Sequence, residues 1–199
     1  MSSTSATSLF LVRDFLDPST CARLLTEVDS SPVTRAPVYI EGSDNNVHEE
    51  VRKTSSLHPS DETIWFVHDQ LMSKKHSLEE HFGCNLTECE KPQFLRYQVG
   101  DFFVRHQDGN TEQLEFDHLR VRRISIVVFL NNSSREIAAG TFCGGSLNFY
   151  DRTAAAPSPQ VSRSIEGETG LLVAFSADEI HEVTPVVHGQ RFTMISWFR

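Results

Sequence analysis

The sequence contains few cysteines and no long apolar run, and each shortage excludes a class of protein. Among its 199 residues there are four cysteines and no C-x-x-C pair, so we expect no disulfide framework. The apolar stretch after the polar N-terminus, "LFLV", is far too short for a signal peptide, and no stretch approaches a membrane span. We therefore expect a cytoplasmic protein, in a reducing compartment, with no membrane association.

Positive charge is also scarce. Lysine and arginine number 18 against 27 acidic residues, which gives a formal net charge of -9. Nucleic acid and anionic membranes would repel such a chain, so neither is an expected partner. We interpret the one basic run, "RVRR" at residues 120–123, as the entry to a strand with solvated ends. The oligomeric state stays open.

The amino-acid composition is that of an ordinary globular protein, and the length of the chain suits one domain. We expect a flexible tail over residues 1–8 and a single domain over residues 9–199. A helix is predicted for "DPSTCARLLTEVDS", with Asp17 or Ser19 as its cap. Apolar spacing predicts a second helix from residue 60 or 61 that is interrupted around "SKKHS" and ends at Gly83.

Beyond residue 92 the chain changes to short segments rich in β-branched and aromatic residues. The helices and strands of residues 9–92 are thus expected to support a β-rich part over residues 93–199. Such an order indicates a mainly β fold, a sandwich or barrel with helices packed on its outside. We predict a loop for "DRTAAAPSPQVSRS", residues 151–164. The predicted strands lie in "QFLRYQV", "FFVRHQD", "RRISIVVFLNN", "GSLNFYD", "GLLVAFS" and "RFTMISWFR".

One of these strands carries a histidine and an aspartate two positions apart, in "VRHQDGN". Alternate strand residues face the same way, so His106 and Asp108 share a face. A surface pair is the ordinary explanation of so short a motif. Much later, His181 begins a β-prone run and offers a third ligand. Two imidazoles and one carboxylate form the facial triad that holds Fe(II), although the same set also binds zinc in hydrolases.

Arg191 favours iron over zinc. It is a lone cation in an apolar strand, ten residues after His181. A buried guanidinium needs an anion and suits bidentate capture of a carboxylate. A dicarboxylate co-substrate that chelates iron at one end would present its far carboxylate there. Tyr97, on a preceding strand, could add a hydroxyl; an internal salt bridge and a core tyrosine are the bland alternatives.

Three segments resemble the catalytic core of the Fe(II)/2-oxoglutarate-dependent oxygenases, in particular their prolyl 4-hydroxylase branch. They are "FLRYQVGDFFVRHQD", "GGSLNFYD" and "GLLVAFSADEIHEVTPVVHGQRFTMISWF". With upstream "LVRDFLDPSTCARLL" and "VRKTSSL", the resemblance runs from about Phe10 to the end. It implies a double-stranded β-helix (jelly-roll) core.

The resemblance implies a role for five residues. His106, Asp108 and His181 would be the iron ligands. Arg191 would pair with the 5-carboxylate of 2-oxoglutarate, and Tyr97 would make a second contact to this co-substrate.

In having arginine at position 191, the chain resembles the oxygen-sensing hydroxylases and their bacterial relatives within this branch, and it departs from them at one position. In those enzymes a tyrosine commonly precedes the "LN" that ends the central strand, whereas this chain has Phe129. One hydroxyl to 2-oxoglutarate is therefore missing, and Ser125 or Thr193 is the candidate to replace it. Trp197 matches an aromatic near the family's active site, and a core tryptophan explains it equally well.

The activity implied is oxidative decarboxylation of 2-oxoglutarate with hydroxylation of an unactivated C–H bond, with ascorbate as a possible further requirement. At the level of the branch the substrate is a prolyl residue of a protein or peptide. A free amino acid or a small metabolite is the alternative, and a non-catalytic jelly-roll binding module is a third reading. Residues 41–57 and 109–119 flank the site and are candidates to contact substrate.

Overall fold

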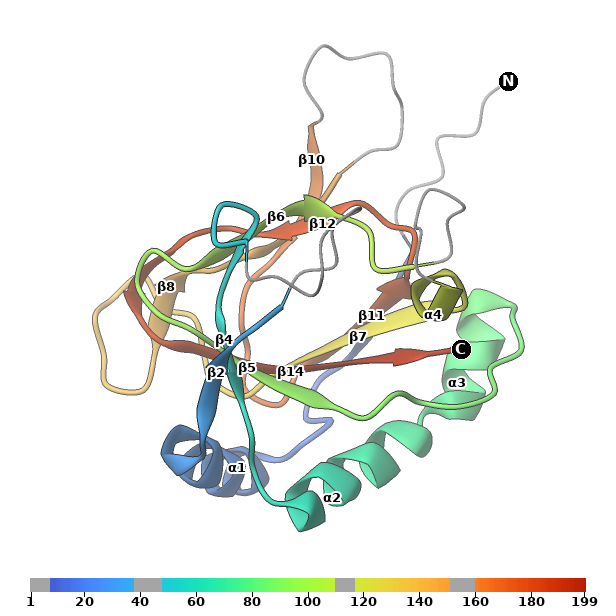
Figure 1. The fold of residues 1–199 in the computed structure, drawn as a ribbon, viewed down its shortest axis with the longest axis horizontal. Coiled ribbons are helices and arrows are strands. Elements are labelled where there is room, and N and C mark those ends of the chain that lie inside the picture. Colours follow the sequence, from blue (N-terminus) through green and yellow to red (C-terminus); the bar gives the residue numbers. More distant parts are fainter. Residues whose placement is uncertain (1–7, 38–47, 110–116, 151–159) are drawn as a thin grey trace.

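The computed structural model describes residues 8–37, 48–109, 117–150 and 160–199 (Figure 1). Residues 1–7 of the tail expected at residues 1–8 therefore lie outside the described residues, as does the segment 151–159. None of the helices in the described ranges is long and apolar enough to cross a membrane. These helices are α1 (Pro18–Ser30), α2 (Asp61–Met72), α3 (Lys75–Phe82) and α4 (Asp117–Arg120).

Two antiparallel sheets form the body of the molecule, and a two-stranded ribbon accompanies them. The larger sheet runs in the order β1-β11-β7-β14-β5-β4-β2, and the smaller in the order β10-β9-β12-β6-β3. The larger sheet comprises β1 (Leu9–Val12), β2 (Val33–Arg35), β4 (Ser55–Leu57), β5 (Gln93–Tyr97), β7 (Ile124–Phe129), β11 (Leu172–Ser176) and β14 (Arg191–Phe198). The smaller comprises β3 (Arg52–Lys53), β6 (Phe102–His106), β9 (Leu147–Tyr150), β10 (Val161–Ile165) and β12 (His181–Val183), and the ribbon β8 (Phe142–Gly144) and β13 (Val186–Gly189).

The sheets and helices are layered. In Figure 1, α1, α2 and α3 lie along one face of the larger sheet, and the strands of the smaller sheet lie over the other. The residues of strand β7 are almost all apolar because both faces of the strand are buried. Ile126 and Val128 join the core under the helices, whereas Val127 and Phe129 join the core between the sheets. Both faces are buried, so a fold that is mainly β with helices outside is confirmed.

The helix predictions hold at their ends. Helix α1 begins after Asp17, whose carboxylate accepts a hydrogen bond from the backbone N–H of Thr20 at 2.9 Å. The second predicted helix is divided, since α2 ends at Met72 and α3 begins at Lys75. Gly83 then ends α3 with a φ of 64°, a conformation that glycine adopts without strain.

The prediction of a loop over residues 151–164 was wrong at its end. Val161–Ile165 forms β10, an edge strand that pairs with β9. Its side chains are mostly exposed, so it lacks the apolar alternation from which a strand is recognised. The hydrogen bonds of β9 impose the extended conformation. Residues 117–119, part of a segment expected to contact substrate, form the short helix α4 together with Arg120, which was expected in the entry to a strand. The division at residue 93 into support and catalytic parts stays a prediction.

The packing of α1 on the larger sheet can be tested at Leu24, which is fully buried in the core under the helices. We expect Leu24→Ala to lower the free energy of unfolding by about 2–5 kcal/mol, because the cavity cannot close completely. Urea unfolding measures this loss. Thr26→Ala, at an exposed site of the same helix, should change it by no more than about 0.5 kcal/mol. Equal losses in both variants would contradict the packing.

Candidate metal centre

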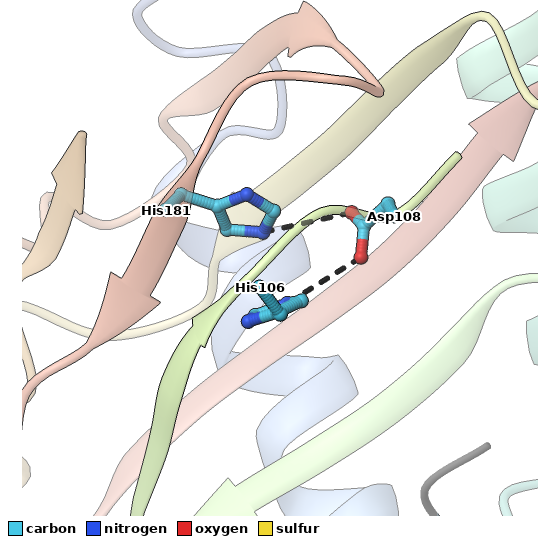
Figure 2. Close-up of side chains that lie close together, drawn as sticks. All are labelled: His106, Asp108 and His181. Carbon is cyan, nitrogen blue, oxygen red and sulfur yellow. Dashed lines mark ion pairs between the residues drawn. The ribbon is translucent and has the colours of Figure 1, made fainter. Parts of the chain in front are cut away.

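The three candidate ligands meet at the ends of two paired strands. His106 is the last residue of β6, and Asp108 follows it by two positions. His181 is the first residue of β12, and the register of the pair places it opposite His106. Figure 2 shows the two rings and the carboxylate converging. The sequence prediction that these residues form one cluster is confirmed by the geometry.

The spacing of the three side chains suits one metal ion. The Nε2 atoms of His106 and His181 lie 3.4 and 3.6 Å from the two carboxylate oxygens of Asp108. All three ligand atoms lie within 4.8 Å of one another. Two nitrogens and one oxygen on one side of a cavity fit the facial triad of a non-haem iron site, which leaves further coordination positions open.

Backbone carbonyls orient both imidazoles. The Nδ1 of His106 lies 2.8 Å from the carbonyl of Val104, and that of His181 lies 2.9 Å from the carbonyl of Glu179. Because a carbonyl only accepts, each Nδ1 must carry the hydrogen and donate. The lone pair of each neutral ring is therefore on Nε2, the atom that faces Asp108. The rings are set for a metal before one binds.

Burial sets the charge of the ligands. Burial alone would raise the pKa of Asp108, but attraction to His181 and His106 in their protonated forms outweighs it and holds that pKa well below its usual range. Burial, assisted by the neighbouring His106, lowers the pKa of His181 from 6.5 to about 4. At neutral pH the site thus presents one carboxylate and a neutral His181, the forms that bind a divalent cation.

Two further residues surround Asp108. Ser125, on β7, donates its hydroxyl hydrogen to the second carboxylate oxygen at 2.8 Å. The backbone N–H groups of Asp108 and Gly109 both bond to the carbonyl of Ala177 at 2.9 Å, which anchors the segment after β6. Trp197 lies opposite Ser125 in the β7–β14 register. Its indole nitrogen is buried and has no hydrogen bond of standard geometry within the described ranges, although its N–H helps to lower the pKa of Asp108.

The triad opens into a cavity of about 410 Å³ between the two sheets. On the larger sheet its wall includes Leu95, Thr193 and Trp197, and on the smaller sheet Phe103 and Val183. Alternation along β14 explains this wall, because every second side chain of the strand faces the smaller sheet. Rotamer-stiff aromatic and branched residues make it a preformed pocket.

Arg191 lies in the same cavity and is 1% exposed. Its guanidinium carbon is 4.9 Å from the ring centroids of both Tyr97 and Phe129. One Nη atom donates to the hydroxyl of Thr193 at 3.1 Å, whereas the Nε has no hydrogen-bond partner. Burial lowers its pKa from 12.5 to about 10, so it remains a cation at neutral pH. Among the described residues no carboxylate pairs with it, so the charge of this buried guanidinium requires an anion from a bound ligand.

A glycine makes room for this arginine. Gly145 has a φ of 62°, and a Cβ built on it would lie 2.8 Å from the Cδ of Arg191. Any larger residue would therefore displace the guanidinium. The absence of a side chain at Gly145 therefore leaves the room that Arg191 occupies.

The predicted contacts to 2-oxoglutarate differ in where they lie. Tyr97 and Thr193 both touch Arg191, where a bound carboxylate would be. Ser125 lies instead on Asp108. Phe129, which replaces the family's tyrosine, supplies a ring face to Arg191 and no hydroxyl. The contacts predicted between 2-oxoglutarate and Arg191, Tyr97, Ser125 and Thr193 stay predictions.

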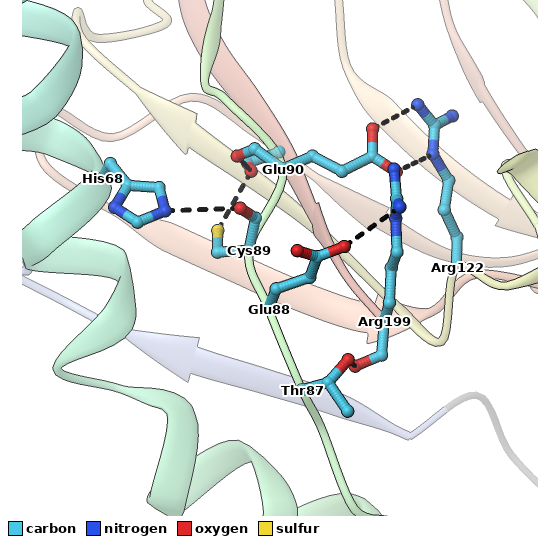
Figure 3. Close-up of polar contacts among 8 residues, drawn as sticks. His68, Thr87, Glu88, Cys89, Glu90, Arg122 and Arg199 are labelled. Atoms are coloured by element: carbon cyan, nitrogen blue, oxygen red, sulfur yellow. Dashed lines mark hydrogen bonds and ion pairs between the residues drawn. The ribbon is translucent and has the colours of Figure 1, made fainter.

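Sequence reasoning missed one polar network beside the pocket (Figure 3). Glu90 holds Arg122 through two hydrogen bonds of 2.9 and 2.7 Å and lies 3.3 Å from Arg199. The guanidinium of Arg122 stacks on Trp197 at 3.6 Å. The solvated strand entry expected at residues 120–123 was therefore wrong for Arg122, which is buried. Nothing in the sequence linked it to Glu90.

Comparison with known proteins agrees with this geometry. Residues 92–199 match the family model described as the 2OG-Fe(II) oxygenase superfamily. The match includes the triad and Arg191, and it extends over more than half of the chain. The chain therefore belongs to the 2OG-Fe(II) oxygenase superfamily, a class of iron enzymes that use 2-oxoglutarate. The expected Fe(II) and 2-oxoglutarate are confirmed at the level of the family, and ascorbate stays a prediction.

More particular likenesses point to hydroxylases. A PKHD-type hydroxylase of Cupriavidus pinatubonensis is 28% identical over 109 residues, which are 54% of this chain but 42% of that relative. A prolyl-4-hydroxylase of Pseudomonas putida has a TM-score of 0.65 at 19% identity, with 98% of this chain and 94% of that one covered. A prolyl hydroxylase of Trichoplax adhaerens, in complex with a hypoxia inducible factor oxygen degradation domain peptide fragment, has a TM-score of 0.72 at 18% identity, with 96% and 83% covered.

The coverage and the sequence identity of these matches decide what each of them shows. The chain spans less than half the length of the curated relative. At identities below 20%, the solved structures establish the fold, and they confirm the expected jelly-roll.

Ser125 can be tested as the residue that orients Asp108. We expect Ser125→Ala to weaken Fe(II) binding by about 10- to 100-fold, because the carboxylate loses the partner that fixes one oxygen. Anaerobic titration with Fe(II) measures the dissociation constant. Ser133→Ala removes a hydroxyl bonded to the backbone of Gly167, away from the triad, and should leave that constant unchanged. Equal constants for wild type and Ser125→Ala would contradict the assignment.

The burial of neutral His181 predicts how stability depends on pH. In the metal-free protein its pKa is about 4, against 6.5 for a free imidazole. Between these values only the unfolded chain binds the proton, so stability is complete above pH 6.5 and falls as the pH drops toward 4. The slope from this group approaches about 1.4 kcal/mol per pH unit. Urea unfolding in the presence of a chelator should show a shallower slope for His181→Gln, and parallel curves would refute this.

Proposed function

We propose that this protein is an Fe(II)- and 2-oxoglutarate-dependent dioxygenase that hydroxylates an unactivated C–H bond. One observation carries the proposal. A facial triad and a buried, uncompensated arginine line the same cavity, as a metal and a dicarboxylate that chelates it would require. A zinc hydrolase would need the triad alone and would leave Arg191 without a task.

The residues divide the work. His106, Asp108 and His181 would hold the metal through Nε2, a carboxylate oxygen and Nε2. Bound Fe(II) supplies the redox chemistry by which dioxygen and 2-oxoglutarate give succinate and CO2, with one oxygen atom inserted into the substrate's C–H bond. Arg191 binds the far carboxylate of 2-oxoglutarate, and the rings of Tyr97 and Phe129 exclude water around that ion pair.

For the substrate, we propose a prolyl residue of a protein or peptide. The fold likeness to prolyl hydroxylases, one of them bound to a peptide fragment, supports this choice. A free amino acid or small metabolite is the alternative, since the same triad would serve it. Of the candidate substrate segments, residues 41–47 and 110–116 lie outside the described residues, whereas Val51 and Leu119 line the cavity. The cytoplasmic location stays a prediction.

The proposal predicts turnover that depends on the triad and Arg191. Anaerobic protein given Fe(II) and 2-oxoglutarate should develop a weak visible charge-transfer band, and air should then yield succinate. His106→Ala should abolish both. Arg191→Met should raise the 2-oxoglutarate concentration needed for half-maximal succinate by about 10- to 100-fold, because a charged hydrogen-bonding partner is lost from a buried site. Succinate is measured by chromatography.

Matched variants control for the loss of a histidine or a charge. His76→Ala, at an exposed site on α3, and Arg96→Met, whose guanidinium pairs with Asp29, should behave as wild type. Folded wild type that shows neither the band nor succinate would sink the oxygenase proposal and favour the binding module. A panel of proline-containing peptides and free amino acids, assayed for stimulated succinate, then separates the two substrate classes.

A further inference from the structure

A second buried arginine lines the cavity on the side opposite Arg191. Arg52 belongs to β3, at the edge of the smaller sheet, and lies across from Phe103 of β6. It is 8% exposed, although β3 is only two residues long and lies at the sheet edge. A buried guanidinium in a cavity wall requires an explanation.

Two contacts hold Arg52 in place. One Nη atom, Nη1, donates to the carbonyl of Pro37 at 3.3 Å. The guanidinium carbon lies 4.8 Å from the ring centroid of Phe103, and that ring stacks on His106 with centroids 3.5 Å apart. Arg52 is therefore separated from a metal ligand by one aromatic ring. Its position is set by the same strand that positions the triad.

The other edge of the Arg52 guanidinium, formed by Nε and Nη2, makes no hydrogen bond to the described residues. Both of these nitrogen atoms are buried. In Arg122 the same two atoms hold both carboxylate oxygens of Glu90, at 2.9 and 2.7 Å. This edge is a fork of parallel N–H donors that matches a carboxylate. Buried charged donors that make no hydrogen bond cost free energy, and a bound acceptor at Nε and Nη2 of Arg52 would offset that cost.

The charged residues of the cavity wall also indicate that Arg52 binds an anion from outside the described chain. Its wall contains three arginines, and Asp108 is the one carboxylate among the described lining residues. Asp108 is committed to the triad, and Glu90 compensates Arg122 from outside the wall. The co-substrate would compensate Arg191, on the other sheet. Among the described residues of the cavity wall, Arg52 is then the one cation for which neither the chain nor 2-oxoglutarate supplies an anion.

We propose that Arg52 binds a carboxylate of the substrate, so that the C–H bond to be hydroxylated belongs to an acid. This inference rests on the proposed function and narrows its substrate class. The carboxylate is either the α-carboxylate of a free amino acid or an acidic group beside the target residue of a peptide. A substrate that offered only neutral amides would leave the fork half satisfied and its charge uncompensated.

Binding of matched acids and amides tests the proposal without turnover. Anaerobic protein loaded with Fe(II) and 2-oxoglutarate is titrated with L-proline and L-prolinamide, and with a blocked alanyl-prolyl-aspartate tripeptide and its asparagine counterpart. In at least one pair the acid should bind about 10- to 100-fold more tightly than the amide. The pair that shows the preference identifies the source of the carboxylate. Calorimetry measures the affinities.

Two substitutions assign the preference to this side chain. Arg52→Met should bring the affinities of acid and amide together. Arg52→Lys keeps the charge without the fork, so it should retain a preference of only a few-fold; it also covers the case in which the methionine variant does not fold. Arg23→Met is the matched control, because Arg23 also stacks on a phenylalanine, Phe66, but is exposed on α1 and distant from the cavity. It should keep the wild-type preference.

The proposal is overturned if wild type binds each acid no better than its amide, if neither acid binds, or if the preference persists in Arg52→Met. These outcomes are separable from failure of the proposed function, which appears as absence of the charge-transfer band and of succinate in wild type. A protein with a normal band and no preference for acids would be an oxygenase whose Arg52 has another task.

Discussion

The antiparallel pairing of β12 with β6 supports the rest of the site, because it sets His181 opposite His106. Side chains alternate across a strand, so a slip of one residue would turn an imidazole to the opposite face of the sheet. The pairing of β12 with β9 on its other edge holds the register from both sides. Asp108 then needs only the short anchored segment after β6 to reach both rings.

The second constraint is the electrostatics of a closed space between two sheets. Burying a charge in such a cavity costs free energy unless an opposite charge pairs with it. Within the described chain Glu90 forms an ion pair with Arg122, and Asp108 stays ionised, the form that binds a metal. Among the cations of the cavity wall, Arg191 and Arg52 are those to which the described chain supplies no anion. The two proposals therefore place one bound anion on each sheet.

Much of the fold was predictable because burial leaves a period in the sequence. The helices show apolar residues on one face and end at residues such as Gly83, whose backbone freedom stops a helix. Strands buried on both faces, such as β7, appear as apolar runs. Exposed or very short strands leave no such period. β10 was missed because its side chains are mostly exposed, and β8 and β13 were not anticipated as a ribbon because strands of three and four residues are too short to show a period.

The sequence by itself determined the chemistry: the ligand types at His106, Asp108 and His181 and the lone cation Arg191 follow from residue identity and strand parity. The tertiary structure decided the partners. That Ser125 bonds Asp108, that Glu90 neutralises Arg122, and that one edge of Arg52 has no partner could not be inferred from the chain alone. Strand parity tells which face a side chain takes. The partner it meets there depends on contacts between elements far apart in the sequence, which only the packing of the two sheets creates.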